Sequence, residues 1–383
     1  MDDETLNESE TGKTSINSQT DIHKYNAVVF SGGGTKGISF IGAVKYLYDH
    51  NILQNITKYV GSSIGAVIAL VCCLQYKPDE IFELIDKLEL NKLQQIDIDS
   101  IMNITTNFGV DSGEKFIKLI KIIIKKKTGN ETINFIELYN LTGIELIVTG
   151  TCLNNSCVEY FNYINTPEMP VFKAVRISTC FPLYFNSCSL NGKTYVDGAL
   201  AEYYPVCQCE NDKFIGVMIN DTSNEKIDVI DDLFVFVNAL FYINFKKYKH
   251  KLISKYKEQT IVINLSASSI KFDLDKEAKQ HYFNTGYKAA EKHFELLKKK
   301  SNNDADASAD SGAGAGADSG AGAGADADSG AGADSGAGAG ADADSDAGAG
   351  ADADADSDAE IKSKIELDPN NKHTQTDLVN VSN

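Results

Sequence analysis

The chain has 383 residues, with 54 acidic and 36 basic side chains and a net charge of −18 at pH 7. Fourteen aspartates and no Lys or Arg lie between Asp304 and Asp358, among Ala, Gly and Ser. Residues 25–303 are near neutral, so the net charge of the domain neither demands nor forbids an anionic partner. We expect no nucleic-acid binding. We predict a disordered segment over residues 1–24, a folded domain over 25–300 and a low-complexity, disordered acidic tail over 301–383.

The N-terminal 24 residues are polar and lack the basic start and apolar run of a signal peptide. The longest apolar runs, residues 64–74 and 233–243, are too short to cross a bilayer. Eight cysteines without a C-x-x-C pair are typical of reduced, structural thiols, so we expect a cytoplasmic protein. Arg176 is the only arginine and Ile, Asn and Lys are abundant, which is typical of an AT-rich genome such as that of a large DNA virus or a protist.

The first predicted strand, residues 27–30, runs into Ser31-Gly32-Gly33-Gly34-Thr35-Lys36-Gly37, and a helical pattern follows over residues 38–47. Three glycines after a strand expose backbone N–H groups beside the positive end of a helix dipole. The sequence therefore predicts an anion-binding loop that could hold an oxyanion.

The same loop satisfies the dinucleotide fingerprint G-x-G-x-x-G through Gly32, Gly34 and Gly37. That fingerprint expects an acidic residue about 20 positions further on, at the end of the second strand, to hold the ribose. Here the second strand runs into Gly61 and offers no acid. A Walker loop is also excluded, because Gly37 follows Lys36 where Ser or Thr is required.

The second predicted strand, residues 56–60, leads into Gly61-Ser62-Ser63-Ile64-Gly65, and a helical run follows over residues 66–74. G-x-S-x-G between a strand and a helix is the pattern of a nucleophile elbow. The flanking glycines let strand and helix pass closely, while the central serine is lifted clear of the sheet. Ser63, and not Ser62, is therefore the candidate nucleophile.

Strand-like and helix-like segments alternate through the rest of the domain. Helices are predicted from Pro78, from an Asp111-x-x-Glu114 capping box to near Gly129, and over residues 275–299, and strands over residues 144–149, 158–161, 214–219 and 260–264. We expect an α/β fold with a mainly parallel central sheet, helices on both faces, and sites at the carboxyl ends of the strands.

An acidic residue ends a short predicted strand in Tyr195-Val196-Asp197-Gly198-Ala199. Gly198 leaves room for the carboxylate of Asp197 to approach another loop, so Asp197 is the candidate base for Ser63. A further segment precedes it, Ala174-Val175-Arg176-Ile177-Ser178-Thr179-Cys180-Phe181-Pro182.

These segments, in this order, resemble the patatin-like phospholipase family of lipid acyl hydrolases. The family pattern is a G-G-G-x-[RK]-G loop, a G-x-S-x-G elbow, an A-x-R-A-S-x-x-x-P segment and an Asp-Gly-[AG] segment. Lys36 stands where arginine is commoner, and Ile177 replaces a small alanine. The resemblance covers about residues 25–295.

The resemblance implies a phospholipase A-type hydrolase that cleaves esters of membrane phospholipids or related acylglycerols without a metal or organic cofactor. Ser63 would be the nucleophile of a Ser-Asp dyad, and Asp197 the proton acceptor. The backbone N–H groups of Gly32, Gly33 and Gly34 would form the oxyanion hole. The remaining motif positions are Gly37, Gly61, Gly65, Gly198 and Ala199.

Two alternatives stay open. A Ser-His-Asp triad would need one of six histidines, which lie in polar tails, at a helix end or among lysines, although triad members need only be neighbours in space. A catalytically silent patatin-fold protein that binds lipid or acts as a scaffold is the second alternative. Intact Ser63 and Asp197 argue against it.

An enzyme of this kind must reach lipid in a membrane, so we expect it to be peripheral at membranes. Phe241, Phe245, Tyr248, Leu252 and Tyr256 recur at helical spacing among six lysines. The pattern fits either a basic amphipathic helix at the headgroups or a domain helix with its apolar stripe in the core.

A separate peptide motif lies near the C-terminus. Lys372-His373-Thr374-Gln375-Thr376 resembles the K-x-T-Q-T peptide that the dynein light chain binds as an added strand. We therefore predict Thr374, Gln375 and Thr376 as a binding segment for that partner.

Overall fold

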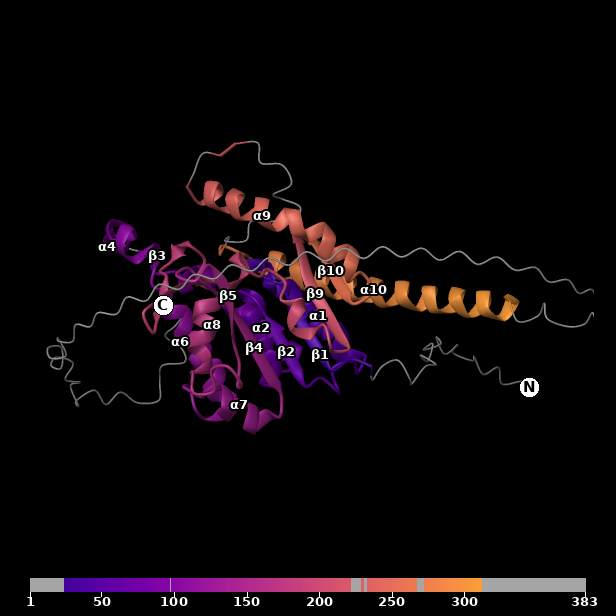
Figure 1. Cartoon of the computed structure of the whole chain (residues 1–383). Coiled ribbons are helices and arrows are strands. Elements are labelled where there is room, and N and C mark those ends of the chain that lie inside the picture. The colour runs from indigo at the N-terminus through magenta and orange to yellow at the C-terminus, as the bar shows by residue number, and fades with distance from the viewer. Residues whose placement is uncertain (1–23, 97, 222–228, 231–232, 267–271, 312–383) are drawn as a thin grey trace, which may run out of the picture. The chain divides into compact units, whose positions relative to one another are not determined.

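The computed structural model describes residues 24–96, 98–221, 229–230, 233–266 and 272–311. Its main sheet has eight strands in the order β10-β9-β1-β2-β4-β8-β7, with β5 paired to β4 (Figure 1). These strands are β1 Ala27–Phe30, β2 Lys58–Gly61, β4 Glu145–Cys152, β5 Cys157–Phe161, β7 Cys188–Leu190, β8 Lys193–Asp197, β9 Phe214–Asp221 and β10 Thr260–Leu265. A separate pair joins β3 Gly109–Asp111 to β6 Leu183–Phe185.

The helices alternate with the strands along the chain, and α10 follows the last strand (Figure 1). They are α1 Ile38–Asp49, α2 Ile64–Cys73, α3 Pro78–Lys87, α4 Ile98–Met102, α5 Ile104–Asn107, α6 Glu114–Thr128, α7 Phe135–Thr142, α8 Val171–Ser178, α9 Leu233–Lys255 and α10 Lys276–Ser311. Four short 3-10 helices are η1 Gly34–Gly37, η2 Leu90–Leu93, η3 Gly198–Leu200 and η4 Val206–Cys209.

The centre of the sheet is parallel. β10, β9, β1, β2 and β4 pair in parallel, and Phe30 at the end of β1 lies opposite Gly61 and Val217. β5 and β8 are antiparallel to β4, and β7 is antiparallel to β8. The predicted mainly parallel sheet is therefore confirmed.

The antiparallel pairing at this edge of the sheet brings Asp197 close to the turn at Ser63. Gly61 pairs with Val148 of β4, and two residues further along β4 Gly150 pairs with Asp197 at the end of β8. The ends of β2 and β8 thus flank the same stretch of β4, although more than 130 residues separate them in sequence.

Both faces of the sheet are buried, as expected of a parallel sheet between helices. In β1, Val28 and Phe30 join the larger core with residues of α1, α2, α6 and α8, while Ala27 and Val29 join a smaller core with η4 and the end of α9. Because side chains alternate along a strand, a continuous apolar run is needed to fill both cores. The predicted helices on both faces are confirmed.

Some predicted boundaries differ from the structure. α10 continues to Ser311, so the predicted domain limit at residue 300 falls within this helix. α6 begins at Glu114, but Gly113 and not Asp111 is its N-cap. Asp111 is fully buried at the end of β3, where its carboxylate accepts from the N–H groups of Gly113 and Gln95, so it cannot also cap the helix. Residues 1–23 and 312–383, which make up most of the two segments predicted to be disordered, lie outside the described residues.

The apolar stripe predicted over residues 241–256 lies partly in the core and partly at positions whose side chains the structure does not describe. Tyr256 is buried against Phe214, and Leu252 packs against the same small core, so these two residues belong to the domain interior. The side chains of Phe241, Phe245 and Tyr248 lie outside the described residues. Among the helices that the structure describes, none combines the length and apolar character needed to cross a membrane.

Candidate active site

The turn between β2 and α2 holds Ser63 in an unusual backbone conformation. Ser63 has φ 54° and ψ −129°, a region that L-residues rarely adopt. A Cβ on Gly61 would lie 2.2 Å from the carbonyl oxygen of Gly65, and one on Gly65 would lie 2.4 Å from that of Ser31. The sharp turn therefore requires glycine at both positions.

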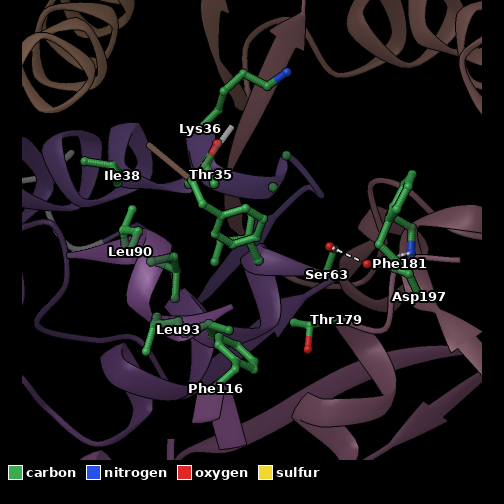
Figure 2. A pocket seen from close by; sticks show the side chains of 18 of the residues that line it. Thr35, Lys36, Ile38, Ser63, Leu90, Leu93, Phe116, Thr179, Phe181 and Asp197 are labelled. Atoms are coloured by element: carbon green, nitrogen blue, oxygen red, sulfur yellow. Dashed lines mark hydrogen bonds between the residues drawn. The ribbon is translucent and has the colours of Figure 1, made fainter. Parts of the chain in front are cut away.

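Ser63 and Asp197 are in direct contact. The Oγ of Ser63 donates a hydrogen bond to Oδ2 of Asp197 over 2.7 Å, as the dashed line in Figure 2 shows. Oδ1 of Asp197 accepts from the N–H of Ala199 at 2.8 Å. Ser62 is directed elsewhere, since its Oγ accepts from the hydroxyl of Thr149 at 2.9 Å.

The carboxyl group of Asp197 is almost completely buried, at 3% exposed. Burial raises the pKa of Asp197 to about 7, against the opposing effect of hydrogen bonds from Ser63 and Ala199. A carboxyl group with a pKa near 7 is a stronger base than an ordinary aspartate and is still largely ionised at slightly alkaline pH.

The glycine-rich loop presents two donors where the sequence predicted three. The N–H of Gly32 donates to the carbonyl oxygen of Tyr203 at 2.8 Å, so it is not available to an oxyanion. Within the described part of the chain, the N–H groups of Gly33 and Gly34 donate to no protein acceptor. They lie at the start of η1, where the first N–H groups of a helix have no partner within the helix.

The loop is packed tightly around these donors. A Cβ on Gly33 would lie 2.4 Å from Cδ1 of Ile219, and one on Gly32 would lie 2.8 Å from Cβ of Ala199. A side chain at Gly32 would meet the Cβ of Ala199, which cannot rotate away, whereas a side chain at Gly33 would require the end of the Ile219 side chain to move.

An apolar cavity of about 280 Å³ contains Ser63 and Asp197 in its wall. Figure 2 shows Leu90, Leu93 and Phe116 on one side of Ser63 and Asp197 on the other. Three helices supply much of the apolar lining: α2 with Ile64, Val67, Ile68 and Val71, α3 with Ile81, Leu84 and Ile85, followed by Leu88, and α6 with Phe116, Leu119, Ile120 and Ile123.

A buried ion pair lies in the same wall. The ammonium group of Lys36 contacts Oδ2 of Asp221 at the end of β9, and their side chains are 1% and 7% exposed. Figure 2 shows the side chain of Lys36 extending away from Ser63. Burial lowers the pKa of Lys36, against the opposing effect of Asp221.

Two positioning groups were not predicted from the sequence. Ser178, the last residue of α8, accepts a hydrogen bond from the backbone N–H of Ser63 at 3.0 Å. Thr151 donates to the carbonyl oxygen of Asp197 at 2.8 Å. Ser178 lies in the singled-out segment at residues 174–182, whereas nothing in the sequence marks Thr151 beyond its place in a strand.

Among the described residues, neither a histidine nor a group of metal ligands lies at the cavity. His50, His281 and His293 have described side chains, and none of them lines the cavity. Over the described residues, no three His, Cys, Asp or Glu side chains are grouped so as to hold a metal ion.

Comparison with known proteins identifies the family to which this geometry belongs. Residues 28–208 match the model of the patatin-like phospholipase family. The chain carries a patatin-like phospholipase domain. The matched residues contain the glycine-rich loop, the Ser63 elbow and Asp197, and the family indicates lipid hydrolysis as the activity.

Two viral relatives match the patatin-like domain over most of their length. An uncharacterized protein of Acanthamoeba polyphaga mimivirus is 29% identical over 274 residues, which are 68% of this chain and 91% of the relative. A protein of Invertebrate iridescent virus 6 named "Probable lipid hydrolase" is 27% identical over 286 residues, 72% of this chain and 90% of the relative.

A solved structure is similar to the patatin-like domain in its fold. VipD from Legionella pneumophila matches with a TM-score of 0.50 at 16% identity, over 71% of this chain and 67% of that one. The likeness supports the α/β architecture described above.

Proposed function

We propose that this chain is a serine esterase that cleaves the acyl ester bond of glycerolipids, as a phospholipase A does with membrane phospholipids and a lipase with acylglycerols. Ser63 is the nucleophile and Asp197 the base. One observation carries the proposal: the 2.7 Å hydrogen bond between Ser63 and Asp197, in the wall of an apolar cavity.

The first half of the reaction forms an acyl-enzyme. The Oγ of Ser63 attacks the ester carbonyl carbon while Asp197 takes the hydroxyl proton. The carbonyl oxygen becomes an oxyanion, and the N–H groups of Gly33 and Gly34 are the donors placed to stabilise it. Collapse of the tetrahedral intermediate breaks the bond to the alcohol, which leaves with the proton held by Asp197.

The second half releases the fatty acid. A water molecule attacks the acyl-enzyme as Asp197 accepts its proton, and the same two N–H groups stabilise the second oxyanion. The bond to Ser63 then breaks, the proton returns to its Oγ, and the carboxylic acid departs. Each proton passes through Asp197, so the pKa of this one group controls both halves.

The apolar walls explain why the acyl part of the substrate would bind here. Burying one methylene group stabilises a complex by about 0.8 kcal/mol, so several methylenes between α2, α3 and α6 supply much of the binding free energy. Polar side chains are scarce along this part of the wall, and a sugar or peptide substrate would lose hydrogen bonds to water there without replacement.

A membrane surface is the proposed source of this lipid. Phe236, Leu240 and Ile243 follow one another at helical spacing on α9 and are 47%, 47% and 65% exposed. Tyr242, beside them on the helix, lines the cavity. An exposed apolar stripe next to a lipid-binding cavity fits insertion into the acyl boundary of a bilayer.

A second exposed apolar group lies close in sequence to the cavity lining. Ile98 and Met102 on α4 are 79% and 76% exposed, a few residues after Leu93 of the cavity wall. We include both groups in the proposed membrane-facing surface. The predicted dynein light chain segment, Thr374 to Thr376, lies outside the described residues and stays a prediction.

Covalent labelling distinguishes this function from a silent patatin-fold protein. A fluorophosphonate probe should phosphonylate Ser63, because an activated serine attacks the probe as it attacks an ester. The modified peptide, identified by mass spectrometry, should contain residues 61–65 with the adduct on Ser63. An unlabelled chain that still binds lipid vesicles would favour the silent alternative.

A further inference from the structure

The ionisable groups of the cavity point to a more specific class of lipid, on the basis of the proposed function. Among the described residues that line it, only Lys36, Asp197 and Asp221 carry ionisable acidic or basic side chains. The carboxylate of Asp197 accepts the hydrogen bond from Ser63. The charge that a substrate headgroup meets is therefore decided by Lys36 and Asp221.

These two groups neutralise each other. The ammonium of Lys36 contacts the carboxylate of Asp221, and both side chains are more than nine-tenths buried. Removing one partner of a buried ion pair leaves an uncompensated charge and is strongly unfavourable. A phosphate that competed for Lys36 would have to displace Asp221 and would leave that carboxylate unpaired.

Two nearby cations are also engaged. Lys92, on η2 beside Leu93, pairs with Glu89 at 3.0 Å. Lys115, next to Phe116, donates to the carbonyl oxygens of Lys92 and Gln94 at 3.2 and 3.1 Å. Lys92 and Lys115 therefore have protein partners already.

Uncharged polar groups are present in the wall. Thr35 and Thr179 bring hydroxyl groups to the cavity, and Tyr242 donates its hydroxyl hydrogen to the carbonyl oxygen of Asp221. Thr179 and Tyr242 donate their hydroxyl hydrogens within the protein, to the carbonyl oxygens of Val175 and Asp221, so their hydroxyl oxygens can accept a hydrogen bond from the free hydroxyl group of a neutral lipid such as a diacylglycerol.

We propose that the site selects neutral acylglycerols over glycerophospholipids because Asp221 neutralises Lys36, which leaves a phosphate no uncompensated cation among the described residues of the wall. In a glycerophospholipid the phosphate is only a few bonds from the acyl esters, so it must enter this region when Ser63 attacks. The described wall of the cavity offers it no cation other than Lys36, and Asp221 already neutralises that cation. A diacylglycerol carries no such charge.

The test compares two lipids with the same acyl chains, dioleoylglycerol and dioleoylphosphatidic acid, in the same detergent micelles. The wild-type chain should hydrolyse the neutral lipid at least about tenfold faster, measured as kcat/KM. Asp221→Asn removes the negative partner and frees the charge of Lys36 for phosphate, so the neutral-to-phosphate ratio should fall by about tenfold.

A charge-free variant controls for the loss of the ion pair itself. Lys36→Met combined with Asp221→Leu replaces the pair by apolar groups, which a buried position tolerates better than a lone charge. This double variant should retain the wild-type preference for the neutral lipid. If Asp221→Asn does not fold, the wild-type ratio still decides whether the neutral lipid is preferred, and a double variant that hydrolyses the phosphatidic acid as fast as the neutral lipid would overturn the inference.

The outcomes separate this inference from the proposed function. Equal or faster hydrolysis of the phosphatidic acid by the wild-type chain, or an unchanged ratio in folded Asp221→Asn, overturns the inference while ester hydrolysis stands. A wild-type chain that cleaves neither lipid nor p-nitrophenyl butyrate overturns the proposed function, and the inference with it.

Discussion

The backbone N–H of Ser63 donates a hydrogen bond to the side-chain oxygen of Ser178, 3.0 Å away. Ser178 is fully buried at the end of α8, and Ser63 is held at a positive φ. A buried N–H left without a partner costs about 1–3 kcal/mol. The bond therefore stabilises the strained elbow that directs the hydroxyl of Ser63 to Asp197.

Ser178→Ala should lower kcat for a soluble ester by about tenfold or more, with little change in KM, because the nucleophile is less well positioned. Ser178→Thr keeps the hydroxyl group and should recover most of the rate. Ser189→Ala, an exposed serine on β7, is the matched control. A loss of thermal stability without a change in kcat would show that Ser178 has only a structural role.

The pKa of Asp197 predicts the pH dependence of the reaction. Since the group must be ionised to accept a proton and its pKa is about 7, kcat/KM should rise with pH and reach half its maximum near pH 7. An ordinary aspartate, with a pKa of about 3.9, would give a rate independent of pH above about 5. Such a flat profile, measured with p-nitrophenyl butyrate, would contradict the role assigned to Asp197.

The same shift predicts a stability effect. In the folded state Asp197 holds its proton up to about pH 7, whereas in the unfolded chain it loses it near pH 4, so folding stability falls as pH rises between these values. Asp197→Asn removes the titrating carboxyl group, and with it this fall in stability, while keeping the shape of the side chain.

The difference in melting temperature between Asp197→Asn and the wild-type chain should therefore be more positive at pH 8 than at pH 5. The comparison needs no activity, so it tests the electrostatics of Asp197 separately from catalysis. A difference that does not vary with pH would show that the carboxyl group is not shifted in the folded protein.

The exposed stripe on α9 predicts how membrane binding depends on side chains. Replacing Phe236, Leu240 and Ile243 together by Ser should weaken binding to phospholipid vesicles by about tenfold or more, since each large apolar side chain contributes about 1.5–3 kcal/mol when fully buried. Sedimentation with vesicles measures the effect, and turnover of a soluble ester reports whether the site is intact.

A triple variant at other exposed apolar positions provides the control for α9. Leu141, Leu153 and Ile164 are 59%, 48% and 64% exposed and do not line the cavity. Their replacement by Ser should leave vesicle binding unchanged. Equal losses in both triple variants would mean that binding is nonspecific.

Local patterns in the sequence predicted much of the fold. β1 spans residues 27–30 as predicted, because a continuous apolar run that Asn26 precedes and Ser31 and a glycine-rich loop follow admits few alternatives. The turn at Ser63 and the acid at Asp197 were also recognised from local spacing. The structure places their side chains in contact through the antiparallel pairing of β8 with β4.

The features that sequence did not reveal depend on contacts between distant segments. The N–H of Gly32 is engaged by Tyr203, about 170 residues later, and Lys36 pairs with Asp221, which is 185 residues away. A glycine-rich loop exposes its N–H groups in the same way whether or not a distant carbonyl oxygen reaches one of them. Periodicity likewise gives the apolar positions of α9 but not which of them face the core.

The most direct test of the account is the rate of ester hydrolysis in Ser63→Ala and Ser62→Ala, two neighbouring serines that the fold assigns to different partners. Ser63 donates to Asp197, while Ser62 accepts from Thr149. We predict that Ser63→Ala reduces hydrolysis of p-nitrophenyl butyrate to background with its folding preserved, and that Ser62→Ala stays within about tenfold of wild type. A folded Ser63→Ala that remains within about tenfold of wild type would contradict the assignment of Ser63 as the nucleophile.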